Sequence, residues 1–264
     1  FHGRSLACVT ATGQKKYRVG FDPLPQGFKI VPFNDLQSVE DAIDDSICAV
    51  MVEPVQGEGG IVPADETYLK GLRDLCDKHN ILLIFDEIQC GMGRTGHLFA
   101  YQGYNVIPDM ITIAKALGGG FPIGALLAKE EIANAFDKGD HGTTFGGNPL
   151  ATAAAYASVS TLINENLAQK AQQTGTYLMN KLNEKRKKTT HIKEVRGKGL
   201  MIGIVLDQKG KEIVPEMMKH GVLANCTAEN VIRFVPPLTI SEKDLDTAVN
   251  VLMDAIKEVF SDDN

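Results

Sequence analysis

The sequence lacks the marks of several broad protein classes. It has no excess of positive charge, since 27 Lys and Arg stand against 33 Asp and Glu for a net charge of −6, so nucleic acid and anionic membranes are poor partners. No apolar stretch approaches the length of a transmembrane helix. The five cysteines are scattered and form no C-x-x-C pair, which disfavours a disulfide scaffold or a zinc site and favours the reducing cytoplasm.

The residues that are present are typical of a soluble globular protein. Apolar residues make up 44% of the 264 residues and charged residues 23%, and this length suits one large domain or a large and a small one. The acidic balance does not exclude a small anionic substrate, because a local basic site does not require a basic protein.

The first half of the chain alternates short apolar runs with helical patterns. Residues 9–33 are predicted as loops, and Asp35 is predicted to cap a short helix at 36–44. A second helix is predicted at 67–79, and strands at 48–54, 81–87, 110–114 and 123–128. This alternation predicts an α/β fold with a mostly parallel sheet. Only a short Gly-rich link joins the last two strands, so the fourth is predicted to run antiparallel to the third.

The second half has a different pattern, which predicts a small α+β domain. Asn148 and Pro149 begin a helical region that extends to 188, with a break near 164–166. Strands are predicted at 199–206, 222–226 and 230–236, a short helix at 213–219, and a last helix from Ser241 to near Phe260. We therefore expect a large domain over 1–155 and a small C-terminal domain over 156–264.

Three charged residues lie at the carboxyl ends of predicted strands: Glu53, Asp86 and Lys115. Ligands of open α/β sheets bind at the carboxyl ends of the strands. We expect Lys115 to be buried at such a strand end. Burial would lower the pKa of its amine and make it a nucleophile that can form a Schiff base with a carbonyl. Enzymes that use pyridoxal phosphate need such a lysine, and an acid against the pyridinium nitrogen. Asp86 and Lys115 fit these two roles, although a cap of the next loop is the favoured explanation for any single strand-end acid.

The segment GMGRTG at 91–96 formally matches the G-x-G-x-x-G fingerprint of dinucleotide-binding proteins. That fingerprint should open a helix directly after a strand. Here the polar segment DEIQC separates the motif from the strand, and the residues that follow have no clear helical stripe. The context therefore disfavours a dinucleotide site.

Several longer motifs resemble one family. The stretches IFDEIQCGMGRTG, PDMITIAKALGGGFPIGA, HGTTFGGNPLA, FHGRSL, VEPVQGEGGI and VIRFVPPL occur in the expected order over nearly the whole chain. They resemble the class III (ω-amino acid) aminotransferases, which use pyridoxal phosphate and have fold type I. Within the class, the motifs are most similar to the acetylornithine branch, with the ornithine, succinylornithine and 4-aminobutyrate enzymes as close alternatives.

The resemblance implies a role for each matching residue around the cofactor. Lys115 would hold the cofactor covalently and move a proton, and Asp86 would pair with the pyridine nitrogen. The further cofactor contacts that it implies are Gln89 near the ring hydroxyl, Ile88 on one ring face, and Phe1 on the opposite face with His2 beside it. No metal is implied.

The resemblance also implies a homodimer and a substrate site. Thr144, with Thr143, would reach the cofactor phosphate of the partner subunit. Arg4 and Arg233 would bind substrate carboxylates, and Glu58 would pair with Arg233 when the ω-amino donor is bound. An arginine that a glutamate pairs with in one half-reaction and releases in the other lets one site accept both substrates. The alternative is that Glu58 and Arg233 form only a structural ion pair.

Members of this family carry a substantial N-terminal portion before the motif that here begins at Phe1. That portion supplies a loop at a helix N-terminus that holds the cofactor phosphate. We therefore expect this chain to be N-terminally truncated. An inactive fragment that acts only as a dimerising scaffold is the alternative to an active enzyme.

Overall fold

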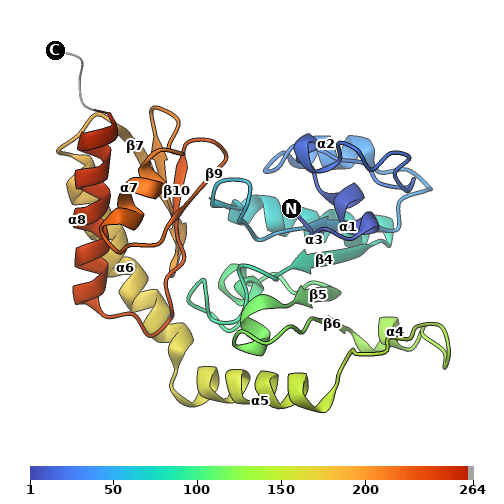
Figure 1. Ribbon diagram of the computed structural model, residues 1–264. Coiled ribbons are helices and arrows are strands. Elements are labelled where there is room, and N and C mark those ends of the chain that lie inside the picture. Colours follow the sequence, from blue (N-terminus) through green and yellow to red (C-terminus); the bar gives the residue numbers. More distant parts are fainter. Residues whose placement is uncertain (261–264) are drawn as a thin grey trace. The chain divides into compact units, whose positions relative to one another are not determined.

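The computed structural model describes residues 1–260, and the chain divides into two compact units (Figure 1). The first unit consists of residues 1–54, 64–89 and 101–159, and the second of 55–63, 90–100 and the described residues from 160 onward. The division into domains at 1–155 and 156–264 stays a prediction, and two segments from the first half of the chain group with the second unit.

The first unit contains a four-stranded sheet in the order β1-β4-β5-β6. Its strands are β1 (Ala49–Val52), β4 (Leu82–Asp86), β5 (Met110–Ile113) and β6 (Ala125–Ala128). Strand β4 pairs in parallel with both β1 and β5, while β6 pairs antiparallel with β5. All four predicted strands are confirmed, together with the antiparallel direction of the fourth. The parallel strands β4 and β5 therefore bring their carboxyl ends to the same edge.

The helices of this unit begin largely where the sequence predicts. Asp35 caps α2 (Leu36–Ala42) by accepting a hydrogen bond from the Ser38 N–H at 3.1 Å, and α3 (Glu66–His79) buries its apolar stripe. The prediction of loops over 9–33 is wrong at its start, because α1 (Leu6–Ala11) extends into it and buries Val9. The remaining helical segments are the short 3₁₀ helices η1 (Lys15–Tyr17), η2 (Ala100–Tyr104) and η3 (Lys115–Gly118), and the α-helix α4 (Glu130–Ala133).

The predicted break in the long helical region is confirmed. It separates α5 (Pro149–Asn164) from α6 (Leu167–Arg186). The side chain of Asn148 accepts a hydrogen bond from the Ala151 N–H at 3.0 Å, as expected of an N-cap residue. No helix among the described residues has both the length and the hydropathy of a membrane span.

The second unit is an antiparallel sheet in the order β7-β8-β10-β9, covered by helices. Its strands are β7 (Ile192–Lys198), β8 (Met201–Leu206), β9 (Asn225–Thr227) and β10 (Val231–Phe234). The two predicted helices are observed as α7 (Ile213–Lys219) and α8 (Glu242–Val259). A small hairpin of β2 (Val55–Gln56) and β3 (Val62–Pro63) belongs to this unit. The core lies between the sheet and α6, α7 and α8 and includes Leu178, Leu182, Ile204, Leu252 and Ile256.

Two details of the second unit differ from the sequence predictions. Strands β2, β3 and β7 were not predicted, and the strand expected at 222–226 is observed at Asn225–Thr227. Ser241 does cap α8, since its hydroxyl accepts a hydrogen bond from the Asp244 N–H at 3.1 Å.

The glycine motif at 91–96 lies in this unit as a loop that opens no helix. The Leu200 N–H donates to the Arg94 carbonyl at 3.0 Å, and the Arg94 guanidinium donates to the carbonyls of Leu200 and Pro236. Burial lowers the pKa of Arg94 to about 10. The loop is therefore fastened to the turn between β7 and β8, which agrees with the argument against a dinucleotide site.

Gly175 of α6 lies against the same turn, and its replacement tests how closely these backbones pack. A Cβ atom on Gly175 would lie 2.1 Å from the Gly199 carbonyl oxygen. We expect Gly175→Ala to destabilise the protein by about 1–3 kcal/mol, because a clash with backbone outweighs the better helix propensity of alanine. Urea unfolding measures this change.

Gly71 of α3 provides the matched control. A Cβ atom there would meet the end of the Leu36 side chain at 2.3 Å, and that side chain can rotate away. Gly71→Ala should therefore cost less than Gly175→Ala. Equal stability of Gly175→Ala and the wild type would contradict the close backbone contact.

Candidate active site

Asp86 is the last residue of β4 and is 3% exposed. Its Oδ1 atom accepts hydrogen bonds from the Ile88 N–H at 3.1 Å and from the hydroxyl of Thr112 at 3.2 Å, and Thr112 is its cross-strand neighbour on β5. Its Oδ2 atom lies 2.7 Å from Nδ1 of His2. His2 is expected beside the cofactor ring, and in the structure its ring is in contact with this carboxylate. The result is a buried acid whose two oxygens are both held in position.

Lys115 lies just after β5 and is the first residue of η3. Its backbone φ is +47°, a left-handed conformation that is uncommon for a residue with a side chain. The turn is held by the hydroxyl of Ser158, which donates to the Ala116 carbonyl at 2.8 Å. Such strain persists only where the surrounding structure enforces it, and it is concentrated at functional sites.

The expectation that Lys115 is buried is wrong for the described residues, because its side chain is exposed. The reason is its position: the strand has already ended at Ile113, and Lys115 begins an exposed turn. The described residues therefore do not shield the amine of Lys115 from water. The neighbouring strand ends still bring Lys115 and Asp86 to the same edge of the sheet.

Phe1 and Arg4 lie together with a residue that the sequence did not indicate. The rings of Phe1 and Tyr17 pack edge to face with centroids 5.2 Å apart. The Arg4 guanidinium lies over both rings, 4.3 Å from the Tyr17 centroid and 5.1 Å from that of Phe1. Cation–π contacts of this kind orient an arginine without neutralising its charge. No pattern around Tyr17 marks it in the sequence.

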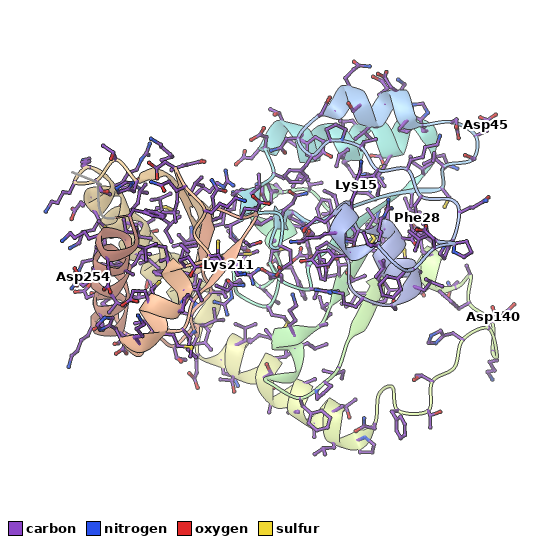
Figure 2. All side chains as sticks on the ribbon, turned by 45° about the horizontal axis from the view of Figure 1, so that its top comes forward. Lys15, Phe28, Asp45, Asp140, Lys211 and Asp254 are labelled. Carbon is purple, nitrogen blue, oxygen red and sulfur yellow. The ribbon has the colours of Figure 1, made fainter. Side chains whose placement is uncertain are left out.

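The other predicted contacts of the cofactor occupy two segments of the first unit. Ile88 and Gln89 come two and three residues after Asp86 and are half-buried. Thr143 and Thr144 are exposed on the loop that Asp140 marks in Figure 2, and the Thr143 hydroxyl accepts a hydrogen bond from the Gly146 N–H at 3.2 Å.

Glu58 and Arg233 belong to the second unit and form the ion pair that the sequence analysis expects. Arg233 Nη1 lies 2.6 Å from Glu58 Oε1, and the two side chains are 11% and 25% exposed, respectively. The Nε–H of Arg233 also donates to Oδ1 of Asn225 at 3.0 Å. Asn225 was not singled out from the sequence, because a lone asparagine in a short strand carries no recognisable signal.

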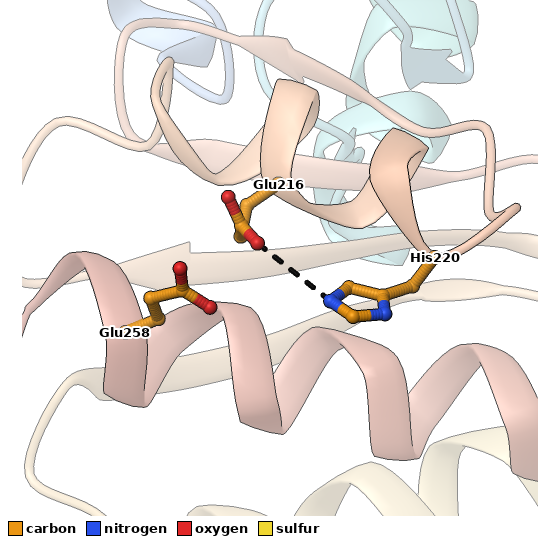
Figure 3. Close-up of side chains that lie close together, drawn as sticks. All are labelled: Glu216, His220 and Glu258. Carbon is orange, nitrogen blue, oxygen red and sulfur yellow. Dashed lines mark ion pairs between the residues drawn. The ribbon is translucent and has the colours of Figure 1, made fainter.

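A second group of polar side chains comes from α7, the residue that follows it, and α8 (Figure 3). Atoms of Glu216, His220 and Glu258 that could bind a metal lie within 4.8 Å of one another. Glu216 is already paired with the Lys219 ammonium at 2.5 Å, and this contact lowers the pKa of the carboxyl. An ammonium in direct contact with the only buried acid makes this group an ion-pair network rather than a cation site.

Comparison with known proteins places this geometry in a family. The family described as "Aminotransferase class-III" matches residues 1–256. The chain belongs to the class-III aminotransferases. It is 54% identical to the acetylornithine aminotransferase of Methanocaldococcus jannaschii and 49% identical to that of Methanothermobacter thermautotrophicus, over 98% of this chain in both cases. It spans 65% and 66% of the lengths of these two relatives.

A solved structure supports the same fold for this class-III chain. The ornithine aminotransferase of Toxoplasma gondii, whose active site has partial occupancy of pyridoxal phosphate, is 33% identical and superposes with a TM-score of 0.93. The match covers 99% of this chain and 63% of that one. The α/β fold predicted from the sequence, that of the pyridoxal-phosphate-dependent aminotransferases, is thereby confirmed.

Proposed function

We propose that this protein is a pyridoxal-phosphate-dependent transaminase that acts on N2-acetylornithine and 2-oxoglutarate. The products are N-acetylglutamate 5-semialdehyde and glutamate, which places the reaction in arginine biosynthesis. The observation that carries the proposal is the identity of 54% and 49% to two acetylornithine aminotransferases over 98% of the chain. We further propose that it works in the cytoplasm.

The residues at the edge of the first sheet fit the cofactor. A bound pyridoxal phosphate would supply an electron sink for the reacting carbon. Asp86, held as an acceptor by three neighbours, is suited to keep a ring nitrogen protonated, and His2 would orient it. Lys115 would hold the cofactor covalently and carry the proton during the reaction. Ile88, Gln89 and Phe1 would contact the ring, as the resemblance implies.

The proposed enzyme is a homodimer with shared active sites. Thr143 and Thr144 are exposed, so they are accessible to the phosphate of a cofactor held by a partner subunit. Arg4, oriented by two aromatic rings, would bind a substrate carboxylate. Arg233 would bind the α-carboxylate of glutamate or 2-oxoglutarate, with Glu58 as its partner when the ω-amino donor is bound. We propose that residues 1–155 and 156–264 are the cofactor and small domains of this enzyme.

Two alternatives compete with this proposal. The donor could be ornithine, succinylornithine, succinyl-diaminopimelate or 4-aminobutyrate, and the similarity to an ornithine aminotransferase keeps the first of these open. The chain could also be an inactive fragment that acts only as a dimerising scaffold. The presence of both Lys115 and Asp86 at one sheet edge favours the enzyme.

A donor panel tests the function directly. With 2-oxoglutarate as acceptor, the full-length protein loaded with pyridoxal phosphate should use acetylornithine with the highest kcat/KM of the five donors. Glutamate formation measures each rate. A higher kcat/KM for another donor would overturn the substrate assignment, and no glutamate with any donor would favour the scaffold.

A further inference from the structure

Two side chains of β9 hold both members of the Glu58–Arg233 pair. Asn225 and Thr227 are two residues apart on this strand, so they share one face of it. Asn225 is the direct cross-strand neighbour of Arg233 on β10 and accepts from its Nε–H at 3.0 Å. The hydroxyl of Thr227 donates to the main-chain carbonyl of Glu58 at 2.6 Å. One short strand therefore fixes the guanidinium group and the backbone of the acid.

The loop that carries Glu58 is also fastened on its far side. The guanidinium of Arg196 on β7 donates to the Gly60 carbonyl at 2.9 Å and to the Ile61 carbonyl at 3.0 Å. Ile61 is fully buried. With Thr227 on one side and Arg196 on the other, the backbone of this loop is held at Glu58 and at the two residues that follow Gly59. These hydrogen bonds hold the backbone at the acid and leave its side chain as the part with the most freedom to rotate.

The contact with Arg233 favours an amide at position 225. The Nε–H of an arginine only donates, so the amide oxygen of Asn225 must face it. A neutral amide orients the guanidinium plane and leaves its charge intact, whereas a carboxylate in the same place would neutralise it. The amide thus fixes the arginine without competing with a substrate carboxylate for its charge.

We propose that Asn225 and Thr227 are the positioning residues of a carboxylate switch. In this switch the Glu58 side chain alone rotates away from Arg233, and the α-carboxylate of a dicarboxylic substrate takes its place. Asn225 keeps the guanidinium oriented in both states, and Thr227 keeps Glu58 in reach for its return. This inference rests on the proposed transaminase function, and it adds the two residues that set the geometry of the exchange.

Asn225→Asp tests the first residue in the full-length holoenzyme, since it changes shape very little and adds a competing carboxylate. We expect KM for 2-oxoglutarate and the Kd of glutarate, a non-reacting dicarboxylate, to rise about ten-fold or more. KM for acetylornithine should change less than about three-fold, a difference of well under 1 kcal/mol. Asn250→Asp, an exposed change of the same charge on α8, should leave all three constants unchanged.

Thr227→Val tests the second residue by replacing its hydroxyl group with a methyl group of similar size. Here kcat/KM should fall for acetylornithine and not for glutamate, because Glu58 loses its anchor while Arg233 keeps its own. Thr176→Val, on the exposed face of α6, is the matched control and should change neither.

The outcomes distinguish a failure of the positioning roles of Asn225 and Thr227 from a failure of the proposed transaminase function. A wild type that transaminates, together with an Asn225→Asp variant whose glutarate Kd is unchanged, overturns the inference and leaves the proposed function intact. A wild type that neither transaminates nor binds glutarate overturns both. Calorimetric titration with glutarate supplies the readout that does not depend on turnover.

Discussion

Replacing Lys115 with alanine is expected to lower kcat by at least about 10³-fold, because a positioned proton-transfer group alone contributes about 10²–10⁴-fold and the covalent attachment is lost as well. The fold should persist, since Lys115 is exposed at the start of a turn. Borohydride reduction of the wild type with pyridoxal phosphate should leave the cofactor attached to this lysine, as peptide mass analysis can establish. Lys138→Ala, an exposed lysine of the same unit, is the matched control and should behave as the wild type.

The backbone conformation of Lys115 predicts a difference in stability between two variants at this position. At φ +47°, a residue with a Cβ atom is strained by about 1 kcal/mol relative to glycine. Lys115→Gly should therefore be inactive and yet more stable than Lys115→Ala. A Lys115→Ala variant that still forms the adduct with the cofactor would refute the assignment of the lysine, whatever its stability.

The sheet of the first unit could be predicted because its strands carry strong local signals. The runs at 81–87 and 110–114 are apolar and short, and the eight-residue link before 123–128 is too short for a parallel crossover. Strand β7 could not be predicted in this way, since its residues after Ile192 are exposed or half-buried and largely charged. An edge strand of this kind forms because β8 offers it hydrogen-bonding partners, which is a tertiary effect.

The candidate site likewise has residues that the sequence could locate and contacts that it could not. Lys115 and Asp86 could be located from the sequence, because both lie at the carboxyl ends of strands that the sequence predicts. The contact of His2 with Asp86, and that of Tyr17 with Arg4, join residues through the folded chain and leave no periodic trace. The exposure of Lys115 was mispredicted for a related reason. A turn of only a few residues decides whether a side chain after a strand is covered, and the turn's left-handed start is invisible in the sequence.

Replacing Asp109 is expected to destabilise the first unit strongly. Its Oδ2 atom accepts from the Leu83 N–H at 2.7 Å and from Arg73 at 2.8 Å, and its Oδ1 atom pairs with Lys129 at 2.7 Å. The side chain is 9% exposed, so one buried acid joins α3, β4 and the segment after β6. Asp109→Asn should cost about 3 kcal/mol, because an amide would turn an N–H toward one of these donors and leave Arg73 without its buried partner.

Asp77→Asn is the matched control, because Asp77 pairs with the same Arg73 at 2.7 Å but is 66% exposed. Exposed pairs contribute little, so this variant should lose no more than about 1 kcal/mol. Urea unfolding at pH 7 compares the two variants with the wild type. If Asp109→Asn is no less stable than Asp77→Asn, the buried acid does not hold these elements together.

The same carboxyl predicts how stability depends on pH. Burial by itself would raise the pKa of Asp109, but the Leu83 N–H, Lys129 and Arg73 outweigh it and hold the pKa below its ordinary value. A folded pKa below the unfolded one means that the stabilisation is fully present above about pH 4, the ordinary range of an aspartate. It is lost as the pH falls from there through the depressed folded pKa. The wild type should therefore lose its advantage over Asp109→Asn in acid, and parallel stability curves for the two proteins would show that the charge of Asp109 is not what stabilises the unit.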